Sequence, residues 1–99
     1  GVAWTSAGAT SPFTFTLPAN SNRGSEVIIY TGGQVTTISP TGDNFVDNAG
    51  SDRSGATPVF LGTSSSQDLQ VPANCWVHLK SYNGAEWTIV ASRGDLNYV

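Results

Sequence analysis

The sequence contains little sulfur and little charge. Cys75 is the single cysteine, methionine is absent, and charged residues make up only 11% of the 99 residues. A lone cysteine excludes an internal disulfide, and one cysteine with one histidine cannot complete a tetrahedral zinc site within the chain. No stripe of basic residues exists that could neutralise a phosphate backbone, so nucleic-acid binding is not expected. The basic residues stand singly at Arg23, Arg53, Lys80 and Arg93.

Long apolar runs are missing as well. A membrane-spanning helix needs about 20 consecutive apolar residues, and no stretch of this chain approaches that length. No basic segment followed by an apolar one opens the sequence, so neither membrane insertion nor a secretory leader is expected. The net charge is only −3, and the surface must consist mainly of neutral polar residues. Such a surface suits contact with other protein chains or with sugars.

Turn formers and strand formers dominate the composition. Eleven glycines, five prolines and many Ser and Thr residues accompany a single lysine, which disfavours helices and favours an all-β fold. The chain is long enough for one domain, residues 1–99, with a small core. Within it, residues 1–11 are either a first short strand or a linker from an upstream region. A domain this small without a disulfide often gains stability by oligomerising.

The clearest strand signal is the segment Cys75–Ala91, which holds two alternating runs around a turn. Successive strand side chains point to opposite faces, so the apolar residues of both runs share one face. A two-residue turn would mix polar with apolar residues on both faces. A three-residue turn at 82–84 instead pairs apolar residues with apolar ones and polar residues with polar ones. We therefore predict that Leu79 pairs with Trp87, Val77 with Ile89, and Lys80 with Glu86.

Other segments show comparable patterns. Residues 12–17 alternate, with Phe13, Phe15 and Leu17 on one face, and Pro18 ends the strand. Residues 27–30 are continuously apolar, which is typical of a central strand buried on both faces. A Gly-Gly pair follows, and residues 34–39 are predicted to return as its hairpin partner. The expected core consists of Val27 to Tyr30, Val77, Leu79, Trp87 and Ile89.

The middle of the chain is harder to assign. Residues 41–58 form a long irregular segment with only Phe45 and Val46 as apolar anchors, and loops of this length are usually functional or flexible. Short strands are expected at 59–62 and 68–71, and a last strand within 92–99. Strands about ten residues apart with turn signals between them indicate an antiparallel β-sandwich or a jelly-roll-like barrel.

The residues needed for catalysis or a cofactor are not evident. His78 is the only imidazole, and no placed partner accompanies it, so we expect no catalytic site, no enzyme activity and no cofactor. Oxygen ligands do gather in one loop, but their spacing matches no cation-binding pattern, and Asn and Asp commonly shape turns. They remain candidates for contacts made by that loop: Asp43, Asn44, Asp47, Asn48, Asp52 and Arg53.

Two further features concern recognition. Arg93-Gly94-Asp95 is the tripeptide that integrins bind, but three-residue motifs arise by chance about once per hundred chains of this length. Trp76, His78 and Lys80 share the predicted wet face of their strand. An aromatic ring beside polar groups suits a sugar, whereas exposed aromatic residues more often mark a subunit interface. Candidates for an interface or a ligand site are Trp76, His78, Lys80, Trp4 and Tyr98.

The second half of the chain resembles small β domains of tailed-bacteriophage structural proteins, over about residues 25–92. The likeness consists of a Pro-x-Gly-polar phrase with a nearby Phe, a short Leu-containing strand, and a closing hairpin with Trp after a Gly-containing turn. The residues that carry it are Pro40-Thr41-Gly42-Asp43, Phe45, Leu69, Trp76-Val77-His78-Leu79 and Trp87-Thr88-Ile89-Val90. The long segment 41–58 departs from this pattern.

This resemblance implies a non-enzymatic β-sandwich protomer assembled as a homotrimer on the virion exterior. Such domains occur in tail fibres, spikes, head fibres and capsid decoration proteins. The implied partners are the capsid or other virion proteins, or a glycan or protein on the host cell surface during attachment. The alternative that the residues leave open is a monomeric carbohydrate-binding module that uses Trp76.

Overall fold

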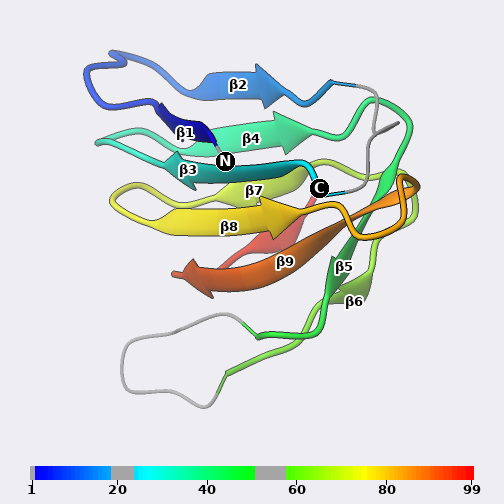
Figure 1. The fold of residues 1–99 in the computed structure, drawn as a ribbon. Coiled ribbons are helices and arrows are strands. Elements are labelled where there is room, and N and C mark those ends of the chain that lie inside the picture. The colour runs from blue at the N-terminus through cyan, green and yellow to red at the C-terminus, as the bar shows by residue number, and fades with distance from the viewer. Residues whose placement is uncertain (1, 19–23, 51–57) are drawn as a thin grey trace.

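The structure is a computed structural model that describes residues 2–18, 24–50 and 58–99, in which strands and no helix occur (Figure 1). Runs of Thr, Val and Ile between glycine-rich turns explain this, because β-branched side chains fit a pleated sheet better than a helix. The strands are β1 (Val2–Thr5), β2 (Phe13–Thr16), β3 (Glu26–Tyr30), β4 (Thr36–Ser39), β5 (Asn44–Asp47), β6 (Gly62–Thr63), β7 (Leu69–Val71), β8 (Trp76–Lys80), β9 (Glu86–Arg93) and β10 (Asn97–Tyr98).

The strands form two mixed sheets. The six-stranded sheet has the order β1-β3-β8-β9-β5-β6, and the four-stranded sheet has the order β10-β7-β4-β2. Three neighbouring pairs are parallel, namely β1 with β3, β5 with β9 and β2 with β4, and the others are antiparallel. The all-β prediction is therefore confirmed, but the expectation of antiparallel sheets is wrong, because each sheet contains parallel neighbours that are joined through the other sheet. The two sheets are compatible with a sandwich, and the described strands do not close a barrel.

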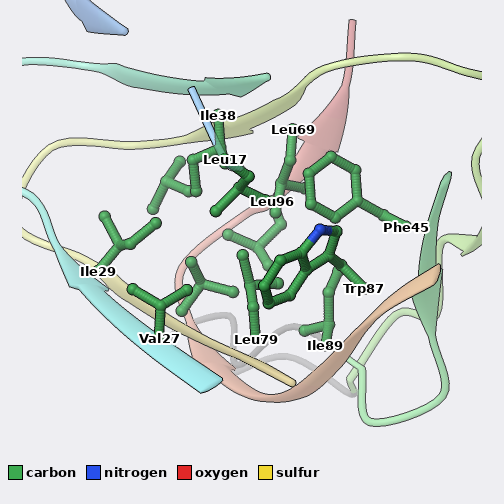
Figure 2. Packing of buried hydrophobic residues seen from close by; sticks show 12 residues of the cluster. Leu17, Val27, Ile29, Ile38, Phe45, Leu69, Leu79, Trp87, Ile89 and Leu96 are labelled. Carbon is green, nitrogen blue, oxygen red and sulfur yellow. The ribbon is translucent and has the colours of Figure 1, made fainter. Parts of the chain in front are cut away.

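One apolar core contains side chains from both sheets. Figure 2 shows these side chains directed toward one another, with the Trp87 indole among them. Burial of each large apolar side chain contributes about 1.5–3 kcal/mol, which makes this core the main source of stability. Its members are Leu17, Val27, Ile29, Ile38, Phe45, Leu69, Val71, Val77, Leu79, Trp87, Ile89 and Leu96.

The predicted core is confirmed in part. Val77, Leu79, Trp87 and Ile89 are all buried, as their alternation indicates. The expectation that residues 27–30 are buried on both faces is wrong. Strand β3 does lie between two neighbours, but only Val27 and Ile29 are buried, while Ile28 is half-buried and Tyr30 is 46% exposed. The core lies on the inner face of β3, and the outer face takes no part in it.

The hairpin register differs from the predicted one by two residues, since Leu79 pairs with Ile89 and not with Trp87. Trp87 pairs with β5 instead, opposite Phe45, because the start of β9 belongs to that parallel ladder. Lys80 pairs with Thr88 in the same register, and a shift of two residues leaves these side chains on their predicted faces. A bulge between His78 and Leu79 shifts the other pairs by one further residue, so that Val77 pairs with Ser92 and His78 with Ala91.

The predicted hairpin between residues 27–30 and 34–39 is also wrong. After the Gly-Gly pair the chain crosses to the other sheet, where β4 lies between β2 and β7. A glycine pair allows a turn, but it does not determine which sheet the next strand joins. The segment 41–58 is not wholly irregular, because it contains β5, which pairs with β9. The expected strands at 12–17 and 68–71 and within 92–99 are confirmed as β2, β7 and β10.

Replacement of one core residue tests this assignment. We expect Leu69→Ala to lower the free energy of unfolding by about 3 kcal/mol, because Leu69 is fully buried and its truncation leaves a cavity. Gln70→Ala is the matched control, since Gln70 lies next to it on the half-buried side of β7 and should cost about 0.5 kcal/mol or less. Urea unfolding measures both values. Equal losses in the two variants would contradict the assigned faces.

Candidate functional site

The face of the six-stranded sheet that is turned away from the core carries a row of aromatic and charged side chains, which we call the outer face. Because side chains alternate along β8, Trp76, His78 and Lys80 point away from buried Val77 and Leu79. The pairing of β3 with β8 adds three more residues to the same face. The outer face is therefore defined by Glu26, Ile28, Tyr30, Trp76, His78 and Lys80.

The outer face has an aromatic end. Tyr30 pairs with Trp76 across β3 and β8, and Arg93 of β9 pairs with Trp76 on its other side. Tyr30 is 46% exposed, whereas Trp76 and the neighbouring Ile28 are half-buried. An aromatic pair beside a branched aliphatic residue offers apolar area together with a phenolic hydroxyl, a combination enriched at protein interfaces. The structure thus confirms the predicted orientation of Trp76 and adds Tyr30 beside it.

The other end of the outer face is charged. The Glu26 carboxylate lies 3.2 Å from His78 Nε2 and 3.8 Å from Lys80 Nζ, and the Lys80 ammonium lies 5.3 Å from the centre of the Tyr82 ring. The His78 contact lacks hydrogen-bond alignment, since within the described ranges its Nε2 has no hydrogen-bond partner. Partly exposed ion pairs of this kind contribute between zero and about 1 kcal/mol. This cluster therefore orients side chains on the outer face more than it stabilises the fold.

Trp4 lies apart from the outer face. It pairs with Ile29 in register, which turns it toward the core side of the sheet. There its ring lies 5.2 Å from that of Phe15 in β2 of the other sheet, and Phe15 in turn lies 4.9 Å from Phe13. Trp4 thus joins the edges of the two sheets at β1 and β2.

Tyr98 joins the two sheets at their opposite edges. Its hydroxyl donates a hydrogen bond to the Gly62 carbonyl of β6, and its ring stacks 6.4 Å from the ring of Phe45. Burial raises the pKa of Tyr98 to about 12, and the nearby Asp47 carboxylate acts in the same direction. The interface candidates are therefore divided among three places, of which only the outer face gathers several of them.

The loop-contact candidates do not form one cluster. Asp47 is buried and accepts backbone N–H groups from Ala49 at 3.1 Å, Gly50 at 2.9 Å and Leu61 at 2.7 Å. Its carboxylate therefore shapes the turn after β5 rather than facing a ligand. Asn44 accepts the N–H of Ser66 at 2.8 Å. The remaining candidates differ in placement: Asp43 is half-buried, Asn48 is exposed, and Asp52 and Arg53 lie outside the described residues.

The Arg93-Gly94-Asp95 tripeptide has a packing role in the turn between β9 and β10. Gly94 adopts φ +106°, and a Cβ at this position would lie 2.3 Å from Cys75 Sγ. Burial raises the pKa of the Cys75 thiol, although Arg93 opposes this shift. The glycine is therefore required by backbone conformation and by the adjacent thiol, independently of any recognition by a partner.

The sequence did not reveal Tyr30 as a member of the candidate site. Its run of four apolar residues, Val27 to Tyr30, masked the alternation that places Tyr30 on the outer face. The available signal was its spacing, because Tyr30 lies an even number of residues from Glu26, a residue that favours a solvent-facing position. The role of Asp47 in the turn after β5 was not predicted either, because the sequence alone does not distinguish it from the neighbouring Asp and Asn residues.

Substitution of Asp47 tests its structural role. Asp47→Ala should lower the free energy of unfolding by about 3 kcal/mol, because three N–H groups lose a charged acceptor. Asn48→Ala, at the exposed neighbouring position, should change it by about 0.5 kcal/mol or less. The melting temperature should be the same with calcium and with a chelator. A calcium-dependent rise would show that the loop binds the ion and would contradict this assignment.

The raised pKa of Tyr98 gives a pH dependence. The folded protein holds this phenolic proton more tightly than the unfolded chain, so the resulting stability is complete below the ordinary value of 10.0 and is lost as the pH rises toward about 12. Spectrophotometric titration should show one late step, a tyrosine that ionises well above the ordinary value of 10.0. Tyr98→Phe should abolish that late step and the accompanying loss of stability. A late step that persists in this variant would refute the assignment.

Comparisons of this chain with protein-family models, with curated proteins and with solved structures find no match. Within the described ranges, no helix is long and apolar enough to cross a membrane. The same residues hold no group of three or more His, Cys, Asp or Glu side chains placed to bind a metal ion. The candidate functions therefore follow from the side chains on the surface of the fold.

Proposed function

We propose that this chain is a non-enzymatic structural domain of a tailed-bacteriophage virion, located on the particle exterior in a tail fibre, a spike or a capsid decoration protein. Its role is attachment to the host or binding to the capsid. Two lines of support come together in this proposal. The sequence resemblance in residues 25–92 names the class of protein, and the all-β fold with two sheets is compatible with the protomer that this class implies.

The observation that carries the proposal is the aromatic end of the outer face. Tyr30, Trp76 and Ile28 lie side by side on a regular sheet surface, and Tyr30 is 46% exposed. Aromatic residues at the centre of an interface contribute a large share of the binding energy. We propose that this end contacts the neighbouring copies in a homotrimer. The charged cluster at Glu26 then lies toward the rim of the contact, where ion pairs influence specificity more than affinity.

A carbohydrate-binding module is the competing function, and the same residues favour it. A sugar ring stacks on an aromatic side chain while its hydroxyl groups bond to nearby polar atoms, and Trp76, Tyr30 and His78 provide both kinds of group. The two functions differ in what covers Trp76, which is a protein chain in one case and a saccharide in the other. The oligomeric state of the free protein therefore separates them.

Light scattering coupled to size-exclusion chromatography is the test. The proposal predicts a mass of about three times 10.3 kDa for the unmodified chain. Trp76→Asp should yield a monomer, because it buries an unpaired charge at the contact. Val35→Asp is the matched control: Val35 is 37% exposed and precedes β4 in the other sheet, so this variant should remain a trimer.

A monomeric mass for the unmodified chain at every concentration would contradict the trimer. A screen of bacterial polysaccharides for quenching of tryptophan fluorescence would then decide the alternative. Quenching that Trp76→Ala abolishes would establish the sugar-binding function.

A further inference from the structure

An uncharged segment of the sequence supplies the strands at one side of the molecule. Residues 1–18 contain no Asp, Glu, Lys or Arg, although the whole chain carries seven acidic and four basic residues. This part of the chain forms β1 and β2, which are the terminal strands of the two sheets. The ring contact between Trp4 and Phe15 places these two strands at the same side of the molecule. We call this side the neutral edge.

The backbone of β2 has hydrogen-bonding groups that its own sheet does not use. The N–H groups of Phe13 and Leu17 donate to Val35 and Ser39, on the β4 side. In a parallel ladder, alternate residues bond to the same neighbouring strand, so the N–H and C=O groups of Thr14 and Thr16 point away from β4. Figure 1 shows β2 at the margin of the fold with no strand beyond it.

The opposite side is built differently. There the hydroxyl of Tyr98, in terminal strand β10, donates to the Gly62 carbonyl in terminal strand β6, and the Tyr98 ring stacks on Phe45. A side chain thus joins the two terminal strands on that side. At the neutral edge the rings of Trp4 and Phe15 make the contact between the terminal strands, the Ser6 hydroxyl bonds to that of Thr36 further inside, and Phe13 remains 42% exposed. The neutral edge therefore combines free backbone groups with accessible apolar area.

Natural sheets usually protect such edges. Charged residues, prolines within the strand and bulges all prevent another strand from pairing. Strand β2 reads Phe-Thr-Phe-Thr and contains none of these, and its β-branched and aromatic residues favour strand pairing. Pro12 and Pro18 lie outside it and limit the pairing length to the five residues Phe13–Leu17. At about 3.3 Å per residue, this length is about 17 Å.

We propose that β2 binds an extended, uncharged segment of a partner protein, which adds to the four-stranded sheet as a further strand. A second backbone is the natural occupant, because the Thr14 and Thr16 groups form a ladder that an extended chain matches at every second residue. Apolar side chains on one face of that segment would lie beside Phe13 and Phe15. A pocket of about 330 Å³, lined by Trp4 and Leu17 and also by Glu26, adjoins this position, and its apolar part offers room for one of them.

The probe for this proposal is the synthetic peptide acetyl-Lys-Thr-Val-Thr-Val-Thr-Lys-amide, in which the lysines provide solubility. Added at millimolar concentration to the ¹⁵N-labelled full chain, it should shift the amide resonances of Thr14 and Thr16 in a saturable way. The matched control is the same peptide with the backbone nitrogens of all five central residues methylated, which keeps the side chains and the charge but loses the N–H donors on both edges of the peptide strand. It should bind at least about tenfold more weakly, as expected for the loss of about one hydrogen bond or more.

Two variants of the chain make the test specific to the backbone. Thr14→Pro removes the free N–H without removing a bond to β4, since proline is tolerated on an edge strand, and it should abolish the shifts. Thr14→Ala retains the N–H and should bind as the unmodified chain does. If Thr14→Pro proves unfolded by its melting curve, the methylated peptide still decides the question.

The proposal would be overturned by equal binding of both peptides, by shifts confined to other surfaces, or by no shift at all. Concentration-dependent shifts of Thr14 and Thr16 without peptide would instead identify a second copy of this chain as the occupant. The inference does not depend on the trimer, because the outer face and the neutral edge share no residue. Trp76→Asp should therefore leave peptide binding unchanged.

Discussion

The fold depends on apolar contact between the inner faces of the two sheets. Neither sheet can bury its apolar side chains alone, and the lone Cys75 provides no internal disulfide. The twelve buried residues come from strands in both sheets and from two connecting segments, so loss of either sheet exposes the other. Trp87 adds a constraint, because its buried Nε1 finds no hydrogen-bond partner among the residues that the structure describes. Its retention in the core is explained by apolar area and not by polar satisfaction.

The sequence predicted which side chains of a strand face the core better than it predicted which strands pair with one another. Alternation identified Val77, Leu79, Trp87 and Ile89 as buried, because the period of two is a local property of an extended chain. It could not identify their neighbours. The predicted pairing of Leu79 with Trp87 assumed that the hairpin was complete by itself, whereas Trp87 is held by β5, more than 40 residues earlier in the chain. Register is decided by such distant strands, which a local pattern does not contain.

The residues of the candidate site show the same difference between what one strand indicates and what strand pairing adds. The outward positions of Trp76, His78 and Lys80 followed from the pattern of one strand, and they do share one face. Tyr30 and Glu26 joined them only through the pairing of β3 with β8. Trp4 and Tyr98 were predicted as candidates for an interface or a ligand site, yet their contacts at opposite edges depend on how the two sheets are aligned. Asp47 required knowledge of where the backbone turns before its carboxylate could be interpreted.

The parallel pairing of β5 with β9 has a consequence for biosynthesis. Strand β5 pairs with the short β6 on one side, but its partner on the other side begins only at Glu86, so the ladder that sets Phe45 opposite Trp87 forms only after most of the 99 residues have been made. Parallel neighbours that are far apart in sequence carry a large loop-closure cost and form slowly. The core therefore cannot close before β9 has been made. Until then the apolar side chains of the earlier strands lack part of their cover, and the few charges of the chain offer little protection from aggregation during that interval.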